Sequence, residues 1–137
     1  MEMEVVSATS THPLYTLLLL RPACGDGAQL PDMLPGQFVQ VAVPDAPHTF
    51  LRRPISINYV DRAAGTMALL VRRAGEGTAR LCDLKEGASL NIVLPLGRGF
   101  SIPERQTGRL VLAGGGVGIA PLYFLGCVLS KMGFNPE

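Results

Sequence analysis

Short stretches of the chain alternate hydrophobic and polar residues, which is the pattern of β-strands with one buried face. The clearest covers residues 37–43, Gln-Phe-Val-Gln-Val-Ala-Val, where the alternation is regular at the start. Turns rich in glycine and proline separate these stretches. The pattern predicts six strands, at residues 5–10, 13–20, 37–43, 53–60, 66–72 and 88–96. With one short helix at 78–84, this arrangement is typical of a small antiparallel Greek-key barrel, a mainly β fold.

The pattern changes after the sixth strand. Glycine, proline, serine and charged residues gather in 97–107, and an uncharged apolar run follows. Residues 109–113 are typical of the buried first strand of a parallel α/β sheet, and 117–132 of the helix after it. We therefore predict a barrel domain over 1–100, a linker over 101–108 and the first βα unit of a truncated α/β nucleotide-binding domain over 109–137. We expect the apolar surface of residues 110–134 to be mobile or to contact other molecules.

Composition and charge narrow the classes of function. The net charge is +1, acids and bases are interspersed, and no tryptophan is present, so a nucleic acid is not the expected partner. Residues 110–130 carry no charge, but their glycines and Pro121 disfavour a membrane-spanning helix, at about 1 kcal/mol for each glycine and about 3 kcal/mol for proline. A strand, a turn and a helix explain this run better, and we expect no membrane association.

The cysteines and the N-terminus suggest a cytoplasmic protein. Cys24, Cys82 and Cys127 are widely spaced and odd in number, which disfavours a disulfide framework. Three thiols also fall short of the four that a [2Fe–2S] cluster normally requires, so no metal site is expected within this chain. The start, Met-Glu-Met-Glu, lacks the positive region of a signal peptide.

Residues 53–56, Arg-Pro-Ile-Ser, place a guanidinium, a rigid proline and a hydroxyl at the start of a predicted strand. The planar donor fork of Arg53 suits phosphate oxygens, and the hydroxyl of Ser56 can both donate and accept a hydrogen bond. Residues three apart face opposite sides of a strand, so both serve one ligand only where the strand bends. A surface arginine beside a strand-edge serine is an equally simple interpretation.

Two glycine-led turns precede predicted helices. Gly75-Glu-Gly-Thr78 would present free N–H groups to a phosphate, although Thr78 could equally be a plain helix cap. Residues 70–72, Leu-Val-Arg, would lie between this turn and Arg53, or would be an ordinary barrel strand. Gly114-Gly-Gly-Val-Gly118 follows an apolar strand and precedes a helix, which is the setting of a nucleotide-binding turn. It departs from Gly-x-Gly-x-x-Gly because Ile119 occupies the last position.

These motifs, in this order, resemble the ferredoxin–NADP reductase superfamily over essentially the whole chain. Within it, Leu51-Arg-Arg-Pro-Ile-Ser-Ile57 and Leu94-Pro-Leu-Gly-Arg-Gly-Phe100 look most like the electron transfer subunits of dihydroorotate dehydrogenase B. The resemblance implies an FAD-binding barrel and a nicotinamide-binding domain, with hydride passing from NADH to FAD. Electrons then pass through a [2Fe–2S] cluster, whose cysteines lie beyond residue 137, to an FMN-containing catalytic subunit in a heterotetramer that serves pyrimidine biosynthesis.

The resemblance also assigns binding roles to residues, and none of them is an acid or base catalyst because the flavin and the nicotinamide carry that chemistry. The residues implied to contact FAD are Arg53, Pro54, Ile55, Ser56, Leu70, Val71, Arg72, Gly77 and Thr78. Those implied to lie near NAD(H) are Gly114, Gly115, Gly116, Val117, Gly118 and Pro121. Ile55 stands where many members have an aromatic residue that stacks on the flavin. A sibling reductase subunit, serving sulfite reductase or a ferredoxin, and a ligand-free barrel module that binds another protein are the alternatives.

Overall fold

The computed structural model describes residues 1–23, 28–46 and 48–137, so the prediction for Cys24 lies outside the described residues. The helices and strands, in chain order, are β1 (Glu2–His12), β2 (Tyr15–Pro22), β3 (Phe38–Val41), β4 (Arg53–Asp61), β5 (Thr66–Arg72), α1 (Glu76–Cys82), β6 (Ser89–Leu96), the 3₁₀ turn η1 (Gly116–Gly118) and α2 (Ile119–Lys131).

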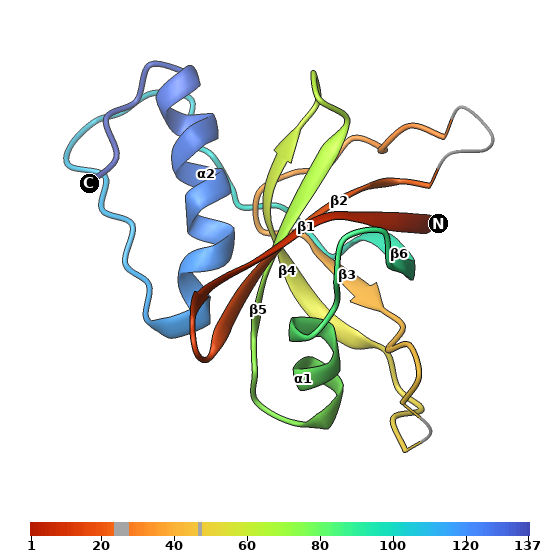
Figure 1. The fold of residues 1–137 in the computed structure, drawn as a ribbon. Helices are drawn as coiled ribbons and strands as arrows, with labels where there is room; N and C mark the ends of the chain where they lie inside the picture. Colours follow the sequence, from red (N-terminus) through yellow and green to blue (C-terminus); the bar gives the residue numbers. More distant parts are fainter. Residues whose placement is uncertain (24–27, 47) are drawn as a thin grey trace.

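The six strands close into an antiparallel barrel with the order β1-β2-β5-β4-β3-β6, which confirms the predicted fold class (Figure 1). Alternate residues of each strand fill its interior. On β5, for example, Met67, Leu69 and Val71 are fully buried. Leu70 is half-buried and Arg72 is exposed. Burial of such apolar side chains is the main source of stability of a barrel of this size.

Several predicted boundaries are wrong. β1 continues through His12, because its pairing with β2 persists to the hairpin end, where His12 lies opposite Tyr15. β3 holds only Phe38–Val41, since the next residues leave the ladder for a turn. Helix α1 begins at Glu76, two residues before the prediction, because Gly75 rather than Thr78 is its N-cap.

The predicted strand at 109–113 does not form. Leu110 makes only an isolated parallel bridge to Pro136, and the amide of Leu112 donates to the carbonyl of Glu137 at 2.8 Å. A parallel strand needs paired neighbours along its whole length, and within the described ranges the backbone of this segment pairs only with the last residues of the chain. The bridge still has the parallel sense expected of two strands on either side of a helix.

Helix α2 packs on the barrel beside β4. The ring of Tyr59 on β4 lies 5.7 Å from that of Tyr123 and 5.9 Å from that of Phe124, both edge-on. Phe124 and Val128 join the hydrophobic cluster of the barrel, and Figure 1 shows α2 standing beside the strands. Within the described residues, no helix is long and apolar enough to cross a membrane.

Candidate functional site

A cleft of about 400 Å³ lies between the start of β4, the loop before it and the first turn of α1. Its lining residues are His48, Thr49, Arg53, Ala74, Gly75, Glu76, Gly77 and Thr78. The barrel creates this proximity, because β4 and β5 are neighbours and α1 follows β5 directly. Two of the predicted elements, the arginine that opens β4 and the glycine-led turn, therefore share one cleft.

Arg53 lies directly against α1 at Gly77. A Cβ added to Gly77 would fall 2.6 Å from Nε of Arg53 and 3.1 Å from Cγ2 of Thr49, so only glycine leaves the guanidinium its place. The Arg53 side chain is half-buried, and it forms no hydrogen bond or ion pair with the part of the chain that the structure describes. A guanidinium in such a cleft, with its donors unused, is suited to an anionic ligand.

The neighbouring Arg52 has the opposite character. Its Nη1 donates to the carbonyl of Asn91 at 2.9 Å, and its Nη2 donates to the side-chain oxygen of the same residue. Asn91 in turn donates to the carboxylate of Glu2. Arg52 therefore joins strands β1, β3 and β6 and takes no part in the cleft.

The hydroxyl of Thr78 serves the turn and not the open side of the cleft. It accepts hydrogen bonds from the amides of Ala74, at 2.9 Å, and Gly75, at 3.1 Å, and it donates to the carbonyl of Gly75 at 3.1 Å. In the described ranges, the amides of Gly77 and Thr78 donate to no backbone carbonyl. These two N–H groups, with the partial positive charge of the helix end, add to the attraction of Arg53 for an anion.

Other residues predicted beside Arg53 do not line the cleft. Ser56 is half-buried and pairs with Phe38 in the β3–β4 ladder, and Pro54 is exposed. Ile55 packs against the hydrophobic core. Arg53 is thus the one member of the 53–56 motif that lines it among the described residues.

The three predicted β5 residues point to different sides. The side chain of Val71 is fully buried inside the barrel, so only its backbone could meet a ligand outside. Leu70 is half-buried opposite Leu17 of β2, and Arg72 is exposed opposite Tyr15. Leu70 and Arg72 therefore share the outer face of the strand, which is turned away from the core.

The second predicted turn borders a separate, mainly apolar hollow. Its volume is about 530 Å³, and it is lined by Leu17, Asn58, Leu112, Gly114, Ile119, Leu122 and Tyr123. A Cβ at Gly114 would lie 2.7 Å from Cδ1 of Leu122, so that side chain would have to shift, and Gly116 has a φ of +56° that favours glycine. Gly115, Val117 and Gly118 are exposed, and Pro121 lies in the first turn of α2.

Sequence reasoning missed His48, Thr49 and Glu76 as lining residues. No periodicity marks residues 48 and 49, and their only signal is that they precede Arg53 by a few positions. Glu76 lies within the predicted turn, but a carboxylate is not the group expected near a phosphate. Within the described ranges, no cluster of three or more His, Cys, Asp or Glu residues could hold a metal ion.

Comparisons with known proteins give relatives and solved structures that are similar to this chain. No family model matches the chain. It is 38% identical over 136 residues to the dihydroorotate dehydrogenase B (NAD(+)) electron transfer subunit of Listeria innocua, covering 96% of this chain and 50% of the relative. The subunit of the same name from Fusobacterium nucleatum is 41% identical over 104 residues, covering 74% of this chain and 39% of the relative. The chain thus spans half or less of the length of these relatives.

Solved structures show the same fold. Phthalate dioxygenase reductase has a TM-score of 0.79 at 23% identity, over 99% of this chain and 41% of the reductase. An NADH-dependent reduced ferredoxin–NADP oxidoreductase has a TM-score of 0.77 at 29% identity, over 97% of this chain and 45% of the other. The resemblance predicted from the motifs is therefore confirmed: over the residues it contains, the chain is similar to the electron transfer subunits of dihydroorotate dehydrogenase B, on a reductase barrel fold.

Proposed function

We propose that this chain is the flavin-binding part of an electron transfer subunit, and that its cleft holds the diphosphate of FAD. One observation carries the proposal: the guanidinium of Arg53, which has no partner among the described residues, lies against the glycine of a helix's first turn, in one cleft. The sequence similarity to oxidoreductase subunits supports the same function.

The residues of the cleft fit an anion of this kind. Arg53 supplies a charged donor fork, and the amides of Gly77 and Thr78 supply neutral donors from the other side. Gly77 has no side chain to separate the two groups. Among the described lining residues Glu76 is the only carboxylate, and it is exposed, so its charge is screened by solvent.

The remaining predicted contacts complete the proposal. Pro54, Ile55, Ser56, Leu70, Val71 and Arg72 are proposed to border the flavin ring, and Gly114–Gly118 with Pro121 to lie near NAD(H). When bound, the flavin supplies the chemistry that takes a hydride from NADH and passes electrons on singly. The chain's own residues bind and orient the coenzyme and neutralise its charge.

The wider assembly follows from the relatives. We propose that the whole protein passes electrons through a [2Fe–2S] cluster outside these residues to an FMN-containing dihydroorotate dehydrogenase subunit, in a cytoplasmic heterotetramer that serves pyrimidine biosynthesis. The names of the relatives favour this partner over sulfite reductase or a ferredoxin. Residues 1–137 alone are not expected to catalyse the full reaction.

Substitution of Arg53 tests the proposal. We expect Arg53→Ala to weaken FAD binding by roughly ten- to hundredfold, equivalent to about 1.5–3 kcal/mol for a lost charge-assisted hydrogen bond. The free energy of unfolding should stay within about 0.5 kcal/mol of the original, because Arg53 bonds to no described residue. The measurements are a titration with FAD, followed by quenching of flavin fluorescence, and urea unfolding.

Arg62→Ala is the matched control. Arg62 is exposed, pairs with Asp32 at 2.5 Å and lies outside the cleft, so the variant makes the same change in net charge. Equal FAD affinity in the Arg53→Ala variant and the unmodified chain would contradict the assignment of the cleft. A chain that binds no FAD and shows no visible flavin absorbance would favour the ligand-free barrel module.

A further inference from the structure

The described residues His48 and Thr49, in the loop between β3 and β4, form the wall of the cleft that faces α1. His48 and Thr49 of this loop line the cleft, and the amide of Thr49 donates to the carbonyl of Ala46 at 2.9 Å. The methyl group of Thr49 would lie 3.1 Å from a Cβ on Gly77, so loop and helix nearly touch there. The position of this loop therefore determines how wide the cleft is.

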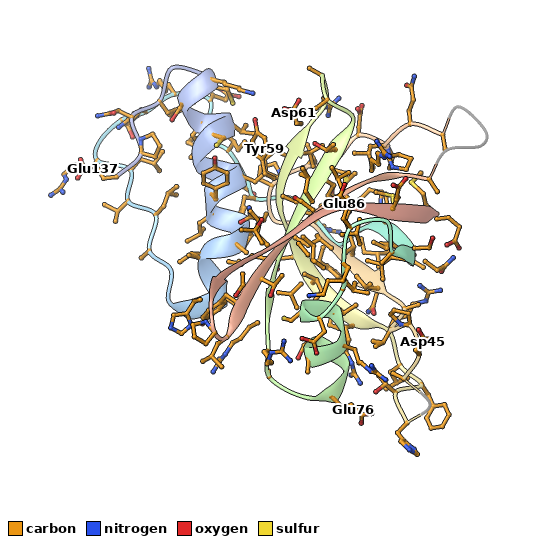
Figure 2. The ribbon with its side chains drawn as sticks, viewed as in Figure 1. Asp45, Tyr59, Asp61, Glu76, Glu86 and Glu137 are labelled. Atoms are coloured by element: carbon orange, nitrogen blue, oxygen red, sulfur yellow. The ribbon has the colours of Figure 1, made fainter. Side chains whose placement is uncertain are left out.

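Arg80 ties this loop to the helix. It lies in the last turn of α1, and its Nη2 donates to the carbonyl of Asp45 at 3.0 Å. Asp45 has a φ of +51°, a left-handed conformation that is uncommon for a residue other than glycine. Figure 2 shows Asp45 on the loop beside the helix that carries Glu76. Arg80 itself does not line the cleft.

We propose that Arg80 is a positioning residue that sets the width of the cleft. By holding the carbonyl of Asp45, it orders the loop before a ligand arrives, so that Thr49 and His48 stand opposite Gly77 at a fixed separation. A loop that is ordered in advance loses less conformational entropy on binding, which raises affinity without any contact between Arg80 and the ligand. This inference rests on the proposed function, because the ligand concerned is the diphosphate of FAD.

The test compares Arg80→Ala with Lys85→Ala. Lys85 is exposed just beyond the same helix and makes no bond to the loop among the described residues, so its removal causes the same change in charge. Two quantities are measured: the dissociation constant for FAD, and the hydrogen-exchange rate of the Thr49 amide in the ligand-free chain. We expect Arg80→Ala to weaken FAD binding by about three- to tenfold and to speed exchange at Thr49, with Lys85→Ala close to the unmodified chain.

The outcomes separate this inference from the proposed function. If Arg80→Ala leaves both the affinity and the Thr49 exchange rate unchanged, Arg80 does not position the loop. If Lys85→Ala weakens binding as much as Arg80→Ala does, charge alone is responsible and the inference is overturned. If the unmodified chain binds no FAD, the proposed function fails, and the Thr49 exchange rate then decides by itself whether Arg80 holds the loop.

Discussion

Arg52 and Arg53 are adjacent in the sequence, yet they belong to two regions of opposite character. Arg52 lies in the seam formed by Arg52, Asn91, Gln40 and Glu2, where donors and acceptors of the protein satisfy one another across three strands. Arg53 lies in the cleft, where its donors face no acceptor among the described residues. In the seam the guanidinium has acceptors within the protein, whereas in the cleft the guanidinium of Arg53 has none among the described residues.

The difference teaches how to tell a structural arginine from a binding one. The two residues are of the same type and adjacent in the sequence, and burial does not separate them, since both are half-buried. What separates them is the set of partners. A guanidinium whose donors face no acceptor among the described residues keeps those donors for an anionic ligand.

The largest effect on folding is expected in the seam. Arg52→Ala removes the hydrogen bond to the Asn91 carbonyl and its bond to the Asn91 side chain, which should lower the free energy of unfolding by about 1.5–3 kcal/mol. FAD affinity, measured on the folded fraction, should change little because Arg52 is outside the cleft. Urea unfolding and FAD titration of Arg52→Ala and Arg53→Ala together give the decisive comparison. If the same variant showed both losses, the two regions would not be separate.

A smaller effect is expected when a methyl group is added to Gly77, which lines the cleft. Gly77→Ala would place a Cβ 2.6 Å from Nε of Arg53, so the guanidinium must move away from the helix. We expect FAD affinity to fall about tenfold, near the lower end of the cost of overpacking, with the far-ultraviolet circular dichroism spectrum unchanged.

Gly108→Ala is the control for this substitution. A Cβ at Gly108 meets no atom within 4 Å, and its φ lies outside the left-handed region. The control should bind FAD like the unmodified chain. Full affinity in Gly77→Ala would show that the place of the guanidinium against the helix does not matter for binding.

The strands of the barrel could be predicted from the sequence because alternation is a local pattern, and the meeting of Arg53 with the glycine-led turn then follows from the strand order, in which β4 and β5 are neighbours. Alternation places Met67, Leu69 and Val71 inside the barrel whatever surrounds it. The sequence did not predict that His48 and Thr49 line the cleft, because they belong to no motif and only the tertiary structure brings them there. The role of the Thr78 hydroxyl was also missed, since one residue type serves helix caps and ligands alike.

The failure at residues 109–113 has a different cause. Their apolar composition is that of a buried parallel strand, but strand formation depends on neighbours and not on composition alone. In the described part of the chain, only residues near Pro136 lie alongside, and one bridge results. Sequence patterns therefore predict which residues can form a strand more reliably than whether a strand forms.

The smallest expected effect concerns Arg73, a third arginine next to the cleft. It resembles Arg52 because it is satisfied, with Nη2 2.5 Å from the carboxylate of Asp83. That hydrogen bond is the main cause that lowers the pKa of Asp83 below its ordinary value of 3.8. Desolvation is the next largest effect and opposes it, and the charges of Arg73, Lys85 and Arg80 each add a smaller lowering. Arg73→Ala should therefore raise the pKa of Asp83 towards 3.8 while leaving FAD affinity unchanged.

The sign of the pH dependence follows from this lowered pKa. Because Asp83 holds its proton less tightly in the folded chain than in the unfolded one, its stabilising effect is present above pH 3.8 and is lost as the pH falls through the folded-state pKa. Both partners are exposed to solvent, so the effect on stability is small. An NMR titration of the Asp83 carboxyl carbon measures the pKa, and Arg109→Ala, remote on the chain and paired with Glu137, is the control. An Asp83 pKa that does not respond to the loss of Arg73, or a loss of FAD affinity in the same variant, would show that Arg73 belongs with Arg53 and not with Arg52.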